Sequence, residues 1–539
     1  MSPLTRKPLY APRGAVATSQ PLAVSAGMAV LRAGGNAVDA AIATAIALTV
    51  VQPGSNDIGG DLFAIVWDGS RVHGLNASGR SPAALTWDLA MAQAELPGGA
   101  LGGSQAEAQH VMRAHGWLPV TVPGAPAGWR DLHARFGRAP FASLFTDAIA
   151  YAAHGYPVSP QLAAGWGRSV EMNERLRGDE FEEWKRIFTI GGRAPREGER
   201  FANPQGARTL ELIAESRAEA FYDGEIAKAI AAHAAATGGL MTTEDLAAHT
   251  STWVEPISAR YRGYDVWEIP PNGQGIAALM ALSILDGMDV AGASPQERLH
   301  WQIEAMKLGF ADAHAYVADP DLAPAPVAGL LDPGYAASRR ALITDRASVP
   351  APGDPARGGT VYLCTADQDG MMVSLIQSNY MGFGSHVAIP GYGFGLQNRG
   401  AGFSLDRAHP NVVAGGKRPF HTIIPGFLTR GGEAVGPFGV MGGHMQPQGH
   451  VQVVMSTVDD GLDPQATLDA PRWYWHAGRA VHAETSMDPA LVESLRARGH
   501  EVTVEDIHYG YGQAIWRLPD GAGYVAGSEP RADGCAFGY

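Results

Sequence analysis

Apolar residues recur at helical spacing in two segments of the first 340 residues. Residues 20–50 are rich in alanine and predict helix on both sides of a break at Gly-Gly-Asn 34–36. Residues 294–317 predict one longer helix, in which Ser294 is the expected N-cap and Glu297 completes a capping box. Four apolar positions of that helix fall on one face: Leu299, Ile303, Met306 and Phe310. We expect this face to pack against a core.

Three other segments of the chain predict β-strands rather than helices. Residues 62–68 predict one strand among the early helices. Residues 360–367 and 371–379 predict two strands that a tight Asp-Gln-Asp-Gly turn joins into a hairpin. We therefore expect the chain to become strongly β from residue 360 onward.

Loops dominate on both sides of that hairpin. Residues 346–359 contain three prolines and three glycines, and this composition predicts a linker or an exposed loop. After the hairpin, short strands alternate with glycine-rich loops, of which 391–403 and 441–450 are examples. A single helix, predicted at Pro489–Arg498, interrupts this pattern.

The composition limits the classes of function. Hydrophobic residues make up 46% and charged residues 17% of the 539, as in a compact globular protein. The net charge of −14, with no run of basic residues, argues against nucleic acid and anionic membrane as partners. Two cysteines, Cys364 and Cys535, form neither a disulfide framework nor a zinc motif. Four histidines have spacings that match no metal-ligand pattern: His386, His421, His444 and His450. We expect no metal and no cofactor.

The N-terminal sequence lacks the continuous apolar stretch of a signal peptide. The longest apolar run, at 40–51, is too short to cross a bilayer and reads as an alanine-rich helix. These features lead us to expect a soluble, cytoplasmic protein.

Thr360 stands between the predicted linker and the predicted hairpin. If the peptide bond before it breaks, its own α-amine becomes a nearby base for its hydroxyl, with a pKa of about 7.7–8.0. Gly358 and Gly359 place no side chain over the scissile carbonyl. The pattern alone also fits an ordinary threonine at the start of a strand.

Six segments, taken in order, resemble the γ-glutamyltransferase family across essentially the whole chain. They are residues 34–63, 121–129, 358–370, 416–425, 441–444 and 529–539. The resemblance implies an α+β fold, a four-layer αββα sandwich of the N-terminal-nucleophile hydrolase type. It also implies a precursor that cleaves itself between Gly359 and Thr360. The large fragment 1–359 and the small fragment 360–539 would remain associated as one intertwined heterodimer, which can pair further.

The resemblance assigns roles to individual residues. Thr360 matches the nucleophile, and Ser378 matches a second hydroxyl, usually threonine in the family, that orients the new amine. Gly442 and Gly443 match the glycine pair whose N–H groups form the oxyanion hole. Arg80 matches the arginine that grips a substrate carboxylate, for which its planar fork is suited.

Other positions depart from the family. Tyr380 replaces an asparagine, Arg399 a glutamine and Gly402 the aspartate that pairs with a substrate α-ammonium. His421 and Thr422 replace two paired serines. We therefore predict that the catalytic machinery is kept while recognition of an α-ammonium is lost.

These departures lead us to expect hydrolysis of the amide of a small carboxylate such as oxamate, through an acyl-enzyme. Tyr380, Arg399, His421 and Thr422 would join Arg80 in binding that small-molecule substrate. Two alternative substrate classes stay open: glutathione or other γ-glutamyl amides, hydrolysed or transferred, and the glutaryl amides of cephalosporin-type acylases. A further alternative is a relative that never cleaves and serves only to bind.

Overall fold

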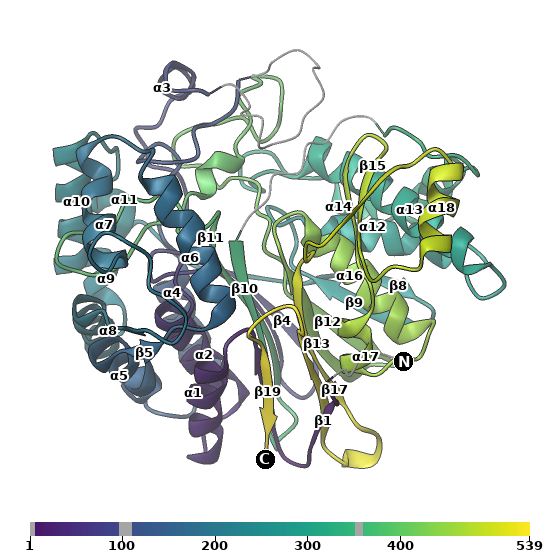
Figure 1. The fold of residues 1–539 in the computed structure, drawn as a ribbon, viewed down its shortest axis with the longest axis horizontal. Helices are drawn as coiled ribbons and strands as arrows, with labels where there is room; N and C mark the ends of the chain where they lie inside the picture. Colours follow the sequence, from purple (N-terminus) through teal and green to yellow (C-terminus); the bar gives the residue numbers. More distant parts are fainter. Residues whose placement is uncertain (1–5, 96–109, 351–358) are drawn as a thin grey trace.

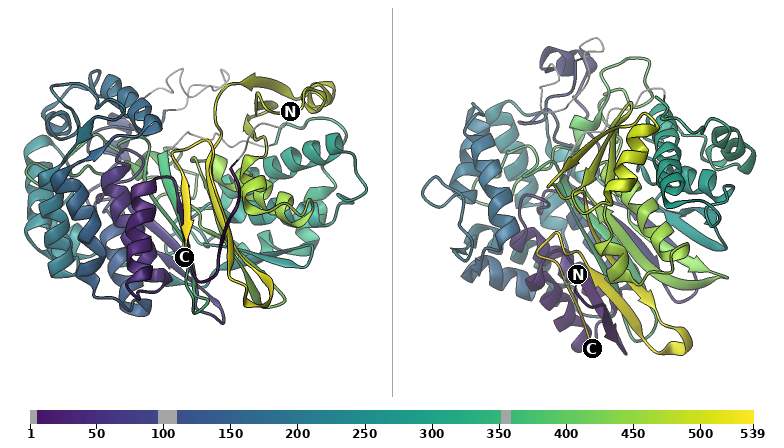
Figure 2. Two further views of the ribbon diagram at one scale, coloured as in Figure 1. Left: turned by 60° about the horizontal axis from the view of Figure 1, so that its bottom comes forward. Right: turned by 45° about the vertical axis from the view of Figure 1, so that its right-hand side comes forward.

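The computed structural model describes residues 6–95, 110–350 and 359–539. Two seven-stranded antiparallel sheets pack face to face, and helices cover both outer faces (Figure 1). Figure 2 shows the same layers from two other sides. The predicted αββα sandwich is confirmed.

The sheet that carries Thr360 consists, in spatial order, of β19 (Cys535–Gly538), β2 (Ala15–Thr18), β10 (Gly359–Ala366), β11 (Met372–Tyr380), β3 (Asp61–Trp67), β4 (Val72–Asn76) and β7 (Thr252–Val254). The facing sheet consists of β1 (Leu9–Ala11), β18 (Tyr524–Ser528), β17 (Tyr511–Arg517), β13 (Glu433–Met441), β12 (Gly426–Arg430), β9 (Tyr264–Glu268) and β8 (Ile257–Tyr261). Two small sheets lie apart: β14 (Trp473–Ala477), β15 (Ala480–Glu484) and β16 (Glu501–Glu505) in one, and β5 (Tyr156–Pro157) and β6 (Arg200–Phe201) in the other.

Each large sheet has its own helical layer. The sheet of Thr360 is covered by α1 (Pro21–Arg32), α2 (Ala37–Val51) and α4 (Ala125–Phe136). The facing sheet is covered by α12 (Gly275–Asp286), α16 (Met445–Val458) and α17 (Pro464–Asp469), and α13 (Pro295–Tyr316) packs on α12. The remaining helices are α3 (Trp87–Ala92), α5 (Thr146–His154), α6 (Pro160–Asn173), α7 (Glu182–Phe188), α8 (Pro204–Ser216), α9 (Glu219–Asp223), α10 (Glu225–Thr237), α11 (Thr243–Ala247), α14 (Val327–Leu330), α15 (Pro333–Arg340) and α18 (Pro489–Ala497).

Local sequence signals account for several of these elements. The break predicted at 34–36 separates α1 from α2, and Asn36 caps α2 in a capping box with Asp39. The predicted capping box of Ser294 and Glu297 begins α13. All four residues of its predicted apolar stripe are buried. The hairpin predicted after residue 360 is β10 and β11, which pair antiparallel.

One prediction about the C-terminal part is wrong. Residues 441–450 were expected to form a glycine-rich loop, yet α16 begins at Met445 and continues to Val458. Its Gly449 packs directly against Val440 of β13, where an added Cβ would lie 2.7 Å from the valine side chain. The glycine therefore permits close helix-on-sheet packing rather than a loop. The short helix α17 was not predicted either.

The predicted loop at 346–359 lies mostly outside the described residues, since 351–358 are not described. Within the described ranges, the structure contains no helix with the length and apolar character needed to span a bilayer.

Candidate active site

The predicted nucleophile and its predicted partner lie side by side. Thr360 is near the start of β10, where a register shift between Gly359 and Val361 interrupts the pairing with β11. Its Oγ1 is 3.1 Å from Oγ of Ser378, which lies near the end of β11. The N–H of Tyr380 donates to the same Ser378 oxygen at 2.8 Å. The hairpin thus places three of the predicted site residues in one hydrogen-bonded group.

Arg399 joins this group from a different part of the chain. Its side chain is buried, with 1% of the residue exposed. Nη1 donates to Oγ1 of Thr422 at 2.7 Å, and Nη2 donates to Oγ of Ser378 at 3.2 Å. The guanidinium carbon lies 4.2 Å from the centroid of the Tyr380 ring, which is a cation–π contact. Arg399 therefore contacts three predicted site residues at once.

The charge of Arg399 is not directly neutralised. Burial lowers the pKa of Arg399 to about 10, and the charge of Asp61 opposes this effect. The group therefore stays a cation at neutral pH. Among the described residues, no carboxylate lies within 4 Å of its guanidinium, and its Nε has no hydrogen-bond partner. A buried cation in this situation favours an anionic ligand.

His421 and Asp61 form a buried pair that lies close enough to Arg399 for its charge to affect both. His421 Nε2 lies 3.1 Å from Oδ2 of Asp61, and neither side chain is exposed. Asp61 starts β3 and is the Cα partner of Ser378 on β11. Burial raises the pKa of Asp61 to about 7, opposed by the charge of Arg399 and by backbone N–H groups. Burial and the charge of Arg399 both hold the pKa of His421 well below its usual value, so the imidazole is neutral.

Gly442 and Gly443 connect β13 to α16. Their φ angles of 135° and 60° lie in the region that favours glycine. No acceptor in the described part of the chain takes a hydrogen bond from either N–H group. These donors, next to the positive N-terminal end of α16, can stabilise an oxyanion.

Gln274 ties this glycine loop to the neighbourhood of Arg399. Its Nε2 donates to the carbonyl oxygen of Thr422 at 2.6 Å and to that of Gly443 at 3.0 Å. Gln274 and Asp61 were not predicted as site residues. Their partners lie far away in sequence, and only Asp61, directly before the strand predicted at 62–68, lay near a local signal.

Arg80 is engaged elsewhere. Its Nη1 donates to Asp319 at 2.7 Å and to the carbonyl oxygen of Gly416 at 3.0 Å, and its Nη2 donates to Asp321. In the described residues, none of its side-chain hydrogen bonds reaches the group around Thr360. The assignment of Arg80 to a substrate carboxylate stays a prediction. That carboxylate would compete with Asp319 and Asp321 for the guanidinium of Arg80.

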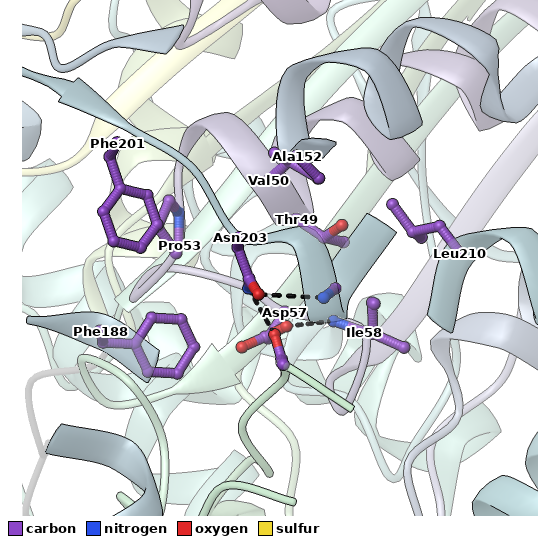
Figure 3. A pocket seen from close by; sticks show the side chains of 12 residues that line it. Thr49, Val50, Pro53, Asp57, Ile58, Ala152, Phe188, Phe201, Asn203 and Leu210 are labelled. Atoms are coloured by element: carbon purple, nitrogen blue, oxygen red, sulfur yellow. Dashed lines mark hydrogen bonds between the residues drawn. The ribbon is translucent and has the colours of Figure 1, made fainter. Parts of the chain in front are cut away.

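A small cavity that none of the predicted site residues lines is structural in character (Figure 3). Its volume of about 20 Å³ is enough for about one water molecule. Burial raises the pKa of Asp57, which lines it, to about 7. The carboxylate accepts hydrogen bonds from the N–H groups of Ile58 and Gly395 and so joins two loops.

The four histidines with no metal-ligand spacing are all buried. A different group, His300, Glu304 and His500, has ligand atoms within 4.8 Å of one another. These atoms already have partners: His300 Nδ1 and His500 Nε2 are 2.8 Å apart, and Lys307 donates to Glu304 at 2.7 Å. The Lys307 ammonium therefore already supplies the positive charge that a metal ion would supply beside Glu304.

The chain is similar to known proteins along nearly its whole length. Residues 23–539 match the family model of gamma-glutamyltranspeptidase. The chain is 35% identical to the glutathione hydrolase-like YwrD proenzyme of Bacillus subtilis, over 96% of this chain and 97% of that protein. It is 33% identical to the oxamate amidohydrolase proenzyme of Klebsiella pneumoniae, with the same two coverages of 96% and 97%.

Solved structures extend the likeness to three dimensions. The crystal structure of cephalosporin acylase from Bacillus halodurans matches with a TM-score of 0.93 and 49% identity, over 100% of this chain and 98% of that chain. The chain therefore belongs to the γ-glutamyltranspeptidase family of self-processing N-terminal-nucleophile hydrolases. Its relatives are hydrolases, amidohydrolases and acylases, and it is an enzyme of this class.

Proposed function

We propose that the chain cleaves itself between Gly359 and Thr360 and then hydrolyses the amide of a small carboxylate substrate of the oxamate type. The fragments 1–359 and 360–539 would stay together, because β10 of the small fragment lies between β2 and β11 in one sheet. β2 belongs to the large fragment and β11 to the small one. Separation would break this sheet.

The reaction needs only groups that the site contains. The freed α-amine of Thr360 takes the proton of Oγ1 as this oxygen attacks the amide carbonyl carbon. The oxyanion that forms accepts hydrogen bonds from Gly442 and Gly443. The carbon–nitrogen bond then breaks, the leaving amine takes the proton, and an ester to Thr360 remains. Water attacks this ester and releases the acid, which restores the threonine hydroxyl.

One observation carries the choice of substrate. Oγ of Ser378 contacts both Thr360 Oγ1, at 3.1 Å, and Nη2 of Arg399, at 3.2 Å. A single hydroxyl group thus separates the nucleophile from a buried cation that has no direct ion pair among the described residues. Such a short separation favours an acyl group whose carboxylate lies next to its amide carbonyl, as in oxamate. A cation at this place also disfavours the α-ammonium of a γ-glutamyl group.

A second candidate is supported by the 49% identity to a structure named cephalosporin acylase. A glutaryl amide has a carboxylate and no α-ammonium, so it also suits a site with Arg399. Its carboxylate lies three methylene groups further from the carbonyl, however. It would need a more distant cation, for which Arg80 is the predicted residue.

Two measurements test the proposal. Denaturing electrophoresis and mass spectrometry should find two fragments, the smaller beginning at Thr360. Thr360→Ala should give one uncleaved chain without turnover, and cleavage in this variant would refute the nucleophile assignment. Release of ammonia from oxamate should exceed hydrolysis of glutathione and of a glutaryl amide. A preference for glutathione would refute the substrate assignment while leaving the nucleophile intact.

A further inference from the structure

A cavity of about 540 Å³ is lined in part by residues that directly follow or precede site residues in the sequence, and it has no role in the mechanism above. It is lined by Met381, which follows Tyr380, and by Met441, which precedes Gly442. One wall is the helix α6, which contributes Trp166 among other residues. The cavity therefore adjoins both the end of β11 and the loop of Gly442 and Gly443, which we call the oxyanion loop.

The lining of this cavity is mainly apolar. Its large apolar residues are Pro53, Leu162, Trp166, Met172, Met381, Phe383 and Met441. Methionine side chains are flexible and polarisable, so three of them can adapt to ring-shaped groups. The volume is far larger than ammonia requires and falls in the usual range of small-molecule sites.

Charge on the lining is balanced. Among the described residues, one cation, Arg168, and one carboxylate, Asp533, line the cavity. His115 and His386 also line it, and burial lowers their pKa values to about 4 and about 3, so both are neutral at neutral pH. A lining without net charge favours an uncharged occupant.

We propose that this cavity binds the amine half of the substrate, and that this amine carries an uncharged, apolar ring. The inference rests on the proposed acyl transfer and extends it. The acyl carboxylate and the amine are attached to the same carbonyl carbon. If Arg399 holds the carboxylate, the amine needs a separate place, and the cavity beside Met381 and Met441 has room for it next to both strands that carry site residues. The substrate class is then an N-aryl or similar N-substituted amide of a small carboxylate.

Two glycines of α6 allow a matched test. Gly165 lines the cavity, and a Cβ added there would meet only Nη2 of Arg168, at 3.8 Å. Gly167 does not line the cavity, and a Cβ added there meets nothing within 4 Å. Leucine at either position fits the helix better than glycine does. Gly165→Leu therefore narrows the cavity, and Gly167→Leu is its control.

The probes are N-phenyl oxamate, which releases aniline and oxalate, and unsubstituted oxamate. We expect the ratio of their kcat/KM values, N-phenyl oxamate over oxamate, to fall about tenfold in Gly165→Leu and to keep its wild-type value in Gly167→Leu. Calorimetry should find that aniline binds the wild-type protein and Gly167→Leu, and more weakly binds Gly165→Leu.

The outcomes separate the two proposals. If the ratio is the same in both variants and aniline does not bind the wild-type protein, the amine site is refuted, whatever the activity on oxamate. If aniline binds as expected but neither amide is hydrolysed, the proposed reaction fails while the cavity remains a site for apolar rings.

Discussion

The guanidinium of Arg399 lies over the ring of Tyr380, with 4.2 Å between the guanidinium carbon and the ring centroid. Both residues are buried, and both stand where the sequence departs from its family. Tyr380 has a φ of 77°, an uncommon conformation for a residue other than glycine. The two departures therefore form one physical unit, in which the aromatic face stabilises a cation that would otherwise be buried at a high free-energy cost.

Replacing Arg399 tests whether this cation binds the substrate carboxylate. We expect Arg399→Gln to lower kcat/KM for oxamate by about 10-fold to 100-fold, because a charge-assisted hydrogen bond contributes about 1.5–3 kcal/mol. Self-cleavage, followed by electrophoresis, should persist, since the carboxylate of a substrate takes no part in it.

Arg407 provides the control for this substitution. Its guanidinium carbon lies 3.8 Å from the centroid of the Trp87 ring, and its side chain is 67% exposed. Arg407→Gln thus also removes an arginine–aromatic contact. Equal losses of activity in Arg407→Gln and Arg399→Gln would contradict a specific role for Arg399.

Ser378 is expected to act on the rate of reaction. Its Oγ contacts the Thr360 hydroxyl, so Ser378→Ala should lower kcat by about tenfold or more through poorer orientation of the nucleophile. Ser374→Ala is a matched control, because Ser374 of the same hairpin shares a buried hydrogen bond of 2.8 Å with Tyr362. Stopped assays and the rate of fragment formation measure both effects. Similar rates in the two variants would show that Ser378 only supports the fold.

The binding of an anion should depend on pH through Asp61. Its pKa of about 7 means that the carboxyl is mostly neutral below pH 7 and mostly anionic above it. An anionic Asp61 offsets the charge of Arg399, so anions should bind more weakly as the pH rises. We expect the inhibition constant of oxalate, the product, to rise about tenfold between about pH 6 and about pH 8.

Asp61→Asn provides the comparison for this pH dependence. The amide cannot ionise, so the inhibition constant should change little over the same range. An unchanged pH dependence in the variant would assign the titration to another group, such as the α-amine of Thr360.

Gln274 should affect the oxyanion loop without contacting the substrate carboxylate. Gln274→Met keeps the length of the side chain but removes both hydrogen bonds to the Thr422 and Gly443 carbonyls. We expect kcat to fall about tenfold with a smaller change in KM. The N–H groups of Gly442 and Gly443 would be displaced, and their hydrogen bonds stabilise the oxyanion of the transition state rather than the bound substrate. Gln452→Met, which removes a hydrogen bond to the carbonyl of Trp473, is the control. A change confined to KM would contradict this role.

The sequence predicted elements whose signals are local. The capping box of Ser294 and the tight turn of the β10–β11 hairpin each depend on residues that are close in sequence, and both elements are confirmed. The start of α16 was missed because its glycines resemble a loop. Gly449 instead lies against Val440 of β13, a tertiary contact that no local signal in the sequence shows.

The site residues also fall into two groups, those that local sequence signals bring together and those that only the complete fold brings together. Thr360 and Ser378 come together through one hairpin, so their proximity follows from local pairing. The contacts of Gln274 depend on residues 148 and 169 positions further along the chain, which no periodicity encodes. Arg399 was singled out by resemblance, yet the absence of a carboxylate within 4 Å of it among the described residues could be known only from the folded chain.

A buried ion pair close to the predicted linker should contribute to stability. Lys307 and Glu304 of α13 are 2.7 Å apart and at most 1% exposed. Both also bind Ser348, which lies shortly before the segment that precedes Thr360. Removing the lysine leaves Glu304 buried without a counter-charge. We expect Lys307→Met to lower the free energy of unfolding by about 3–5 kcal/mol, measured by urea titration.

An exposed pair with the same spacing shows how much of this effect burial causes. Lys185 and Glu182 of α7 are 3.0 Å apart, with side chains that are 38% and 59% exposed. Lys185→Met should change the free energy of unfolding by less than about 1 kcal/mol, because water already solvates both charges. The double variant Glu304→Gln with Lys307→Met should recover part of the lost stability, since no unpaired charge remains. A loss as large in the double variant as in Lys307→Met alone would mean that packing around Ser348, and not the uncompensated charge, determines the effect.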